Sequence, residues 1–207
     1  MKKHQKFIRH RSGCFARPRW RLVASVAVAV ALTVTTVNPV QASNFGRKYA
    51  DDADHYWARV SLTTGGTTAA NWGVTELNSS TEVDTFNDGT CKSHTDICFY
   101  DGNYETAPWI ESVAWWEGHN GLAHCNRTDN LFGLNGQCDR WYVLFDTADM
   151  DTMTTTELWA LGCHEVGHTV GLKHTSDTES CMIAKSNERT SDGLSQHDID
   201  HVDTRYG

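Results

Sequence analysis

Three histidines and one glutamate lie close together in the stretch CHEVGHTVGLKH, residues 163–174. On an α-helix, His164 and His168 stand one turn apart, so their imidazoles lie on one face and can bind one zinc ion. Glu165 is offset by one residue and would stand beside such a metal, where a general base for an attacking water molecule belongs. The spacing therefore predicts hydrolytic chemistry at a zinc ion.

His174 can complete this group only if the helix ends before it. A continued helix would place His174 about 15 Å along the axis from His164, at 1.5 Å per residue, which is too far to share a metal. Gly171 lies between the last two histidines, and glycine readily enters the left-handed conformation that ends many helices. We therefore expect the chain to turn at Gly171 and to bring His174 back as the third ligand.

The complete pattern H-E-x-x-H-x-x-G-x-x-H resembles the zinc signature of the metzincin metalloproteases. Met182 follows His174 by eight residues, within TESCMIA, where that family has a methionine turn beneath its metal. The resemblance implies one catalytic zinc ion. It assigns the role of metal ligand to His164, His168 and His174. Glu165 is then the catalytic base, and Met182 and Gly171 are structural residues.

Two further segments resemble the matrixin group of metzincins. The C-terminal sequence LSQHDIDHVDTRYG is similar to the last matrixin helix, and GLAHC (121–125) is similar to the matrixin edge strand. A protein or peptide substrate aligns on such a strand in extended form, through backbone hydrogen bonds. The resemblance also implies an α+β fold, in which a twisted mixed sheet carries an active-site helix and a C-terminal helix.

The residues after the methionine depart from the matrixin pattern. Ile183 and Ala184 replace the tyrosine and proline that usually follow there, in the segment that lines the pocket for the residue after the scissile bond. Substrate preference is therefore not carried over from the family.

Two additional metal sites are open hypotheses. His124 matches a structural-zinc ligand of matrixins, but Leu144 replaces the histidine of their next strand, so a second zinc would need His119 with His124. Calcium could bind the acidic cluster Asp146, Asp149 and Asp151, which is otherwise a solvated surface.

The surrounding sequence predicts the elements that position the motif. Apolar patterning predicts strands at 56–62, 96–100 and 141–145, a short edge strand at 121–125, and a helix ending near Asn78. TTGGTT is expected to break the first strand. Thr154 and Glu157 have the spacing of a capping box, which predicts that the motif helix begins there and runs to Val170, and Ser195 with Asp198 predicts the last helix in the same way.

Residues 1–42 have the composition of a secretory signal. They carry eight Lys or Arg, no acid, an apolar run over 22–37 and small residues before a cleavage site after Ala42. A membrane anchor is the alternative, but this run is shorter than a span of about 20 residues. We therefore expect a secreted extracellular protein, with no membrane attachment after cleavage, a loose N-terminal arm over 43–54 and one catalytic domain over 55–207.

The charge changes sharply after the signal. Of 18 Lys and Arg, eight lie in the first 42 residues, so ten remain against 26 Asp and Glu, a formal net charge of −16. Such a surface repels nucleic acid and anionic membranes. We expect a monomer with no nucleic-acid partner.

Six cysteines follow the signal: Cys91, Cys98, Cys125, Cys138, Cys163 and Cys181. An even number in an exported domain predicts disulfides, and six cysteines allow fifteen pairings. We expect sequential pairing because it closes short loops. It would join Cys163 to Cys181 and hold the motif helix against the methionine turn. Zinc ligation by cysteines is disfavoured because no C-x₂-C pair is present.

The sequence thus predicts a secreted zinc endopeptidase. One alternative is a hydrolase of a narrow peptide such as a cell-wall cross-link. Another is a secreted, non-catalytic zinc-binding or adhesion module on a protease-like scaffold. Glu165 argues against this module, because a purely structural site gains nothing from a base beside an open coordination position.

Overall fold

The computed structural model describes residues 48–104, 119–128, 136–185 and 189–207, all within one compact unit. The expected signal, residues 1–42, and the first part of the expected arm, residues 43–47, lie outside the described residues. No helix in the described ranges is both long enough and apolar enough to cross a membrane.

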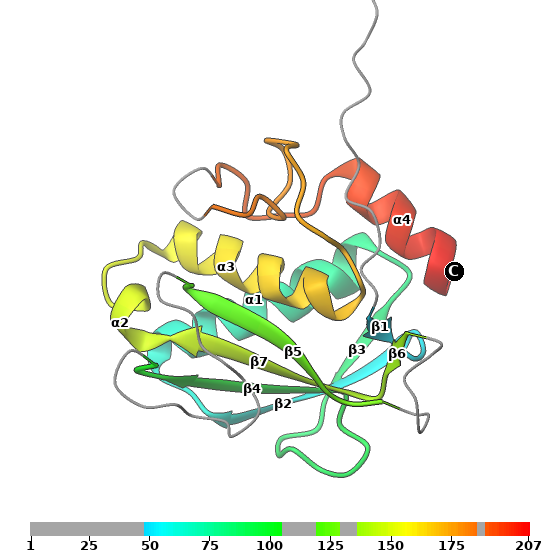
Figure 1. Ribbon diagram of the computed structural model, residues 1–207, viewed down its shortest axis with the longest axis horizontal. Coiled ribbons are helices and arrows are strands. Elements are labelled where there is room, and N and C mark those ends of the chain that lie inside the picture. The colour runs from blue at the N-terminus through cyan, green and yellow to red at the C-terminus, as the bar shows by residue number, and fades with distance from the viewer. Residues whose placement is uncertain (1–47, 105–118, 129–135, 186–188) are drawn as a thin grey trace, which may run out of the picture. The chain divides into compact units, whose positions relative to one another are not determined.

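A five-stranded mixed sheet forms one layer of the fold (Figure 1). Its spatial order is β3-β2-β4-β7-β5, with these bounds: β2, Asp54–Ser61; β3, Asp84–Asn87; β4, Ile97–Gly102; β5, Gly121–Arg127; β7, Arg140–Asp146. β5 pairs antiparallel with β7, and the other three pairings are parallel. β5 therefore lies at one edge of the sheet, as the sequence predicted for GLAHC.

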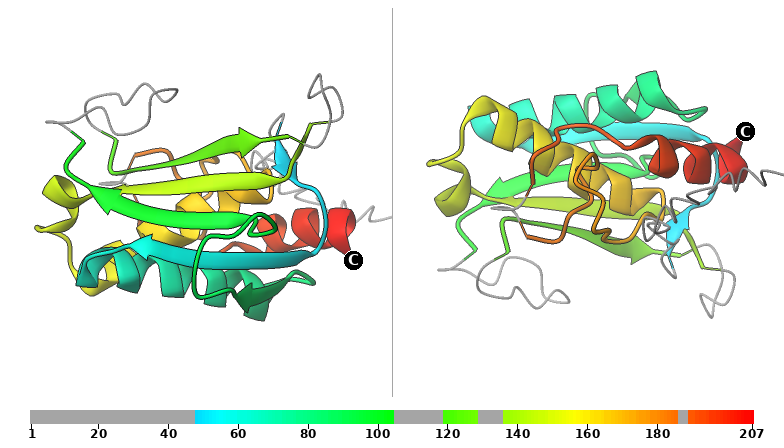
Figure 2. Two further views of the ribbon diagram at one scale, coloured as in Figure 1. Left: turned by 90° about the horizontal axis from the view of Figure 1, so that it is seen from below. Right: turned by 90° about the horizontal axis from the view of Figure 1, so that it is seen from above.

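The helices cover one face of this sheet (Figure 2). They are α1 (Thr64–Ser80), the short α2 (Thr147–Met150), α3 (Thr155–Thr169) and α4 (Gln196–Tyr206). The core between the layers joins Phe99 and Phe145 of the sheet to Leu77, Leu161 and Val166 of the helices, each at most 1% exposed. The architecture is the α+β fold with an active-site helix and a C-terminal helix that the sequence predicted.

Residues 43–54 were predicted to form a loose arm. The described part of this arm instead contributes a strand to a small second sheet. β1 (Tyr49–Ala50) pairs in parallel with β6 (Gln137–Cys138), and Ala50 is 1% exposed. The Tyr206 hydroxyl of α4 donates a hydrogen bond to the Ala50 carbonyl at 3.1 Å. Long-range backbone pairing holds this segment, and its polar composition gave no sign of that pairing.

α1 begins within TTGGTT, the segment that was expected to break the first strand, and β2 does end before it, at Ser61. The Thr63 hydroxyl caps α1 by accepting a hydrogen bond from the Gly66 N–H at 3.2 Å. The Asp101 carboxylate accepts hydrogen bonds from both the amide and the hydroxyl of Thr63, each at 2.6 Å. A Cβ atom on Gly66 would overlap that carboxylate. Gly66 therefore makes room for the residue that fixes the cap.

α1 and α3 cross at two glycines. A Cβ atom on Gly162 of α3 would overlap the backbone of Ala69, and one on Gly73 of α1 would overlap the backbone of Gly162. Backbone atoms cannot move aside by changing rotamer, so both positions need glycine for this approach. The crossing seats α3, which carries the motif, directly against α1.

We expect Gly162→Ala to destabilise the protein by about 3 kcal/mol, the upper end of the usual range for overpacking, because the new methyl group meets backbone. Urea unfolding measures this. Gly65→Ala in α1 is the matched control, since its Cβ would meet only side-chain atoms at 3.8 Å. Equal unfolding midpoints for the two variants would contradict the close crossing.

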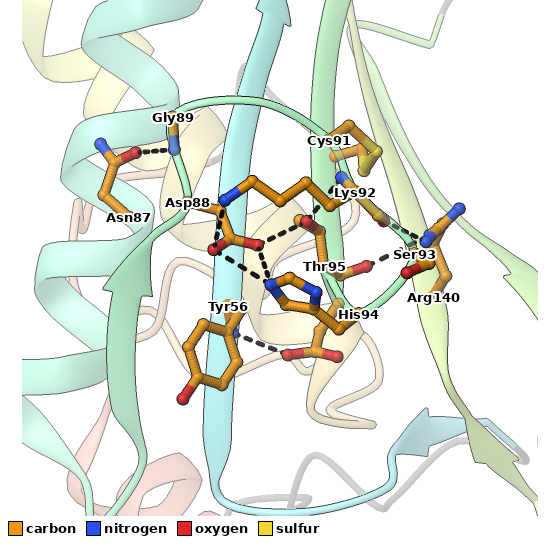
Figure 3. A network of polar contacts seen from close by, with 12 residues as sticks. Tyr56, Asn87, Asp88, Gly89, Cys91, Lys92, Ser93, His94, Thr95 and Arg140 are labelled. Carbon is orange, nitrogen blue, oxygen red and sulfur yellow. Dashed lines mark hydrogen bonds and ion pairs between the residues drawn. A yellow bond between two sulfur atoms is a disulfide. The ribbon is translucent and has the colours of Figure 1, made fainter.

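The loop between β3 and β4 is organised by one carboxylate (Figure 3). Asp88 accepts hydrogen bonds from the Thr95 hydroxyl at 2.6 Å and the Lys92 ammonium at 3.4 Å, and the His94 ring nitrogen lies 3.1 Å from its Oδ2. The Thr95 bond, followed by His94 and Lys92, lowers the pKa of Asp88. These contacts hold the loop where it enters β4.

Three disulfides join Cys91 to Cys98, Cys125 to Cys138, and Cys163 to Cys181. This is the sequential pairing that the sequence predicted. The second bridge ties β5 to β6, and the third ties α3 to the segment that carries Met182.

Candidate metal centre

α3 presents His164 and His168 on one face, as expected from their spacing. The helix begins at the predicted capping box, in which the Thr154 hydroxyl accepts from the Glu157 amide and the Glu157 carboxylate accepts from the Thr154 amide. The two imidazole ring centroids lie 4.6 Å apart, and their Nε2 atoms are 3.1 Å apart.

Gly171 ends α3 and reverses the chain. Its φ is 90°, in the left-handed region that favours glycine. The Leu172 amide donates to the Gly167 carbonyl and the Gly171 amide donates to the His168 carbonyl, both at 3.0 Å. These two bonds form a Schellman motif. The His174 ring consequently lies 5.1 Å from that of His164 and 5.0 Å from that of His168, so the predicted return of His174 is confirmed.

The three imidazoles have the donor arrangement of a metal site. One ring nitrogen from each lies within 4.8 Å of the other two, and no other set of three or more metal-ligating side chains converges in this way within the described residues. The outer nitrogens of two rings are engaged by backbone: His164 Nδ1 donates to the Cys181 carbonyl at 2.9 Å, and His168 Nδ1 donates to the Leu172 carbonyl at 2.8 Å. Each Nε2 therefore keeps its lone pair.

Two facing lone pairs cannot form a hydrogen bond with each other. Their 3.1 Å separation is instead close to the roughly 3.3 Å between two ligands of a tetrahedral zinc ion with Zn–N bonds of about 2.0–2.1 Å. The residues present therefore fit zinc. His174, the exposed member of the three, leaves the group open toward solvent.

Burial keeps the imidazoles neutral, which is the form that binds metal. It lowers the pKa of His164 well below its usual value, and the charges of His168 and Arg189 act in the same direction. Burial likewise lowers the pKa of His168 to about 4, and it lowers the pKa of His174. The apoprotein therefore holds its ligands ready for a cation at neutral pH.

The matrixin family model matches residues 48–207 of this sequence. The chain belongs to the matrixin family. A comparison with curated proteins finds no significant match. Matrixins are in general zinc metalloendopeptidases, so the family agrees with the donor set described above. The match begins at the first described residue and includes β1, part of the segment that had been expected to be a loose arm.

Glu165 of this matrixin is 3% exposed and lies against β5. A Cβ atom on Gly121 of β5 would lie 2.6 Å from Glu165 Oε1, so only glycine leaves room for the carboxylate there. Burial raises the pKa of Glu165 to about 7, opposed by the charge of Arg189 and a hydrogen bond with the Ala123 backbone. The carboxyl group is thus balanced between its acid and base forms near neutral pH.

Met182 packs beneath α3. It is fully buried, and its sulfur lies 2.5 Å from where a Cβ atom on Gly167 would be, so the glycine permits this approach. The Met182 amide donates to the Ser180 hydroxyl at 2.9 Å, and that hydroxyl donates to Asp198 of α4 at 2.6 Å. Together with the Cys163–Cys181 bridge, these contacts join the methionine segment to both α3 and α4.

A cleft of about 880 Å³ opens in front of the three histidines of the matrixin. β5 contributes residues 121–125 to its wall, and the segments after α3 contribute Leu172, Lys173 and Ala184. The cleft therefore runs along the edge strand of the sheet, which is the geometry that an extended peptide needs for strand addition.

Sequence reasoning missed Arg189 and Trp141. Arg189 lines the cleft half-buried, and its Nε donates to the Ile183 carbonyl at 2.9 Å. Its charge lowers the pKa of all three metal-site histidines. Trp141 of β7 also lines the cleft and is 4% exposed. Arg189 belongs to no motif, and Trp141 was assigned only to a strand, so neither residue carried a signal in the sequence.

The other metal hypotheses are not decided by the structure. His119 and His124 both line the cleft, but neither belongs to a three-ligand group within the described residues. Asp146 is engaged as the cap of α2, where it accepts a hydrogen bond from the Ala148 amide at 2.9 Å. A second zinc and a calcium ion stay predictions.

Proposed function

We propose that this matrixin is a secreted zinc endopeptidase in which Glu165 is the general base. One observation carries the proposal: the Nε2 atoms of His164 and His168 face each other with their lone pairs free, and His174 returns beside them. Glu165, a buried carboxylate not used as a ligand, lies next to this group at the wall of the cleft.

His164, His168 and His174 would hold a zinc ion, which would supply a Lewis acid for the peptide carbonyl and for a water molecule that loses its proton near neutral pH. Glu165 accepts that proton as the water attacks the carbonyl carbon, and then delivers it to the leaving amine. A carboxylate suits both transfers because its oxygen can accept a proton from water and release it again to the amine.

β5 positions the substrate in this proposal. The strand is at the edge of the sheet and lines the cleft, so its backbone groups are placed to pair with an extended peptide. Gly121 holds β5 against Glu165, which brings the bound peptide and the base together.

Secretion is supported by the composition of residues 1–42 and by the three disulfides. Disulfides persist in oxidising compartments and are rare in the cytosol. Cleavage of the signal after Ala42 would leave the domain free outside the cell, without a membrane attachment.

The test is hydrolysis of casein and of a broad peptide library, with the zinc removed and restored. We expect cleavage that 1,10-phenanthroline abolishes and that stoichiometric zinc restores. Cleavage that resists chelation would contradict the role of zinc. Tight zinc binding without cleavage of any peptide would instead support the non-catalytic zinc-binding module.

We expect Gly121→Ala to lower kcat/KM about 100-fold, because its methyl group would displace Glu165 and misplacement of a catalytic group by about 1 Å has effects of this size. Steady-state hydrolysis of one fluorogenic peptide measures the loss. Gly102→Ala at the end of β4 is the matched control, since its Cβ would contact Tyr104 at an ordinary 3.6 Å. Equal activity in the two variants would show that β5 does not position the base.

A further inference from the structure

The cations of this acidic protein gather at the cleft. Of the ten Lys and Arg that follow residue 42, four line it: Lys48, Lys173, Lys185 and Arg189. Of the 26 Asp and Glu, Glu165 is the one acid among the described residues that line the cleft. Among the described residues, the charge that lines the cleft is thus opposite in sign to that of the protein as a whole.

The four cations come from different parts of the chain, so no single charged segment explains them. Lys48 precedes β1, Lys173 follows the turn at Gly171, and Lys185 follows the methionine segment. Arg189 lies further along the same loop and is the half-buried member of the group. The fold therefore assembles a basic wall around the zinc ligands from three separate regions.

Arg189 is the cation placed at the reacting centre. Its hydrogen bond to the Ile183 carbonyl fixes the guanidinium beside the methionine segment, and that is its one side-chain hydrogen bond to a described residue. It lines the same cleft as Glu165 and the three histidines. A guanidinium with terminal N–H groups still available is suited to bind a carboxylate through two parallel hydrogen bonds.

Trp141 supplies an independent observation that points to a ligand. Its indole Nε1 is buried and donates to no described residue, although the side chain lines the cleft. A buried donor without an acceptor is costly, so a bound oxygen atom at this place would be stabilising. The Trp141 side chain is therefore the neutral group of the cleft wall whose N–H donor has no acceptor among the described residues.

We propose that the cleft selects acidic peptides, with Arg189 binding an Asp or Glu side chain next to the cleaved bond and with the three lysines attracting further carboxylates of the substrate. This inference rests on the peptidase activity proposed above and adds the substrate class. A half-buried guanidinium contributes to affinity and orientation, whereas the lysines act mainly on the association rate, since exposed charges are screened by salt.

The experiment compares matched fluorogenic peptides that differ only in carrying Asp and Glu, or Asn and Gln, around one cleavable bond. We expect the wild-type protein to favour the acidic peptide by roughly tenfold in kcat/KM, as a carboxylate–guanidinium pair at a partly desolvated site allows. Raising NaCl from about 0.05 to about 0.5 M should reduce this ratio, because the lysines are then screened. The ratio reports selectivity independently of the overall rate.

Arg189→Gln should remove most of the preference and leave only the part that the lysines contribute. Arg59→Gln, which changes an exposed arginine outside the cleft, should leave the ratio unchanged. If Arg189→Gln does not fold, the double variant Lys173→Gln/Lys185→Gln should still lower the ratio, with Lys92→Gln as its control. Equal cleavage of acidic and neutral peptides by the wild type would overturn the inference and leave the peptidase proposal standing. No cleavage of either peptide, with zinc bound, would refute both.

Discussion

Glu165→Gln is expected to lower kcat/KM by about 10³- to 10⁴-fold while the protein folds and binds zinc as before. General acid–base catalysis by one side chain contributes up to about 10⁴-fold, and glutamine cannot accept the proton. Glutamine matches the shape of the buried side chain, which is 3% exposed, and can still accept the hydrogen bond at Ala123. The loss should therefore be confined to chemistry. Peptide hydrolysis, zinc content and thermal unfolding of the same preparation measure all three properties.

The control for this variant is Glu179→Gln, which changes an exposed glutamate outside the cleft. Its kcat/KM should equal that of the wild type. If Glu165→Gln kept more than about a tenth of the wild-type activity, far more than the loss of a general base allows, the role assigned to Glu165 would be wrong.

His174→Ala is expected to weaken zinc binding by more than about 100-fold and to abolish measurable hydrolysis. Removing a hydrogen-bond partner of a metal ligand already costs about 10- to 100-fold in affinity, and removing a ligand itself should cost more. His174 is the exposed ligand, so its loss should change the stability of the metal-free protein by less than about 1 kcal/mol. Competition with a chromogenic chelator measures zinc affinity, and unfolding with and without zinc separates binding from folding.

His94→Ala provides the comparison, because His94 is exposed and lies beside Asp88, away from the metal site. It should bind zinc like the wild type. Unchanged zinc affinity in His174→Ala would mean that the metal is held without the residue that the turn at Gly171 brings back.

The predictable parts of this fold are those whose causes are local in sequence. The turn at Gly171 follows from the inability of a straight helix to bring His174 to the metal, and the caps at Thr154 and Ser195 follow from side chains three residues apart. Each disulfide joins two cysteines that are neighbours in sequence order. The argument that sequential pairing closes short loops therefore predicted the pairing.

The parts that were missed depend on partners distant in sequence. The start of α1 within TTGGTT depends on Asp101, from another strand, which occupies the space that the missing side chain of Gly66 leaves. β1 pairs with a segment more than eighty residues away, as the register of Tyr49 with Gln137 shows. Arg189 reaches the site through a loop with no periodicity, and its importance comes from where the fold places it.

The position of the metal tests the central claim most directly. A crystal of the zinc-loaded protein, with diffraction recorded on both sides of the zinc absorption edge, would locate the ion by its anomalous signal. We predict one strong peak about 2.0–2.1 Å from a ring nitrogen of each of His164, His168 and His174. A peak bound elsewhere, or a His174 ring turned away from the other two, would contradict the account.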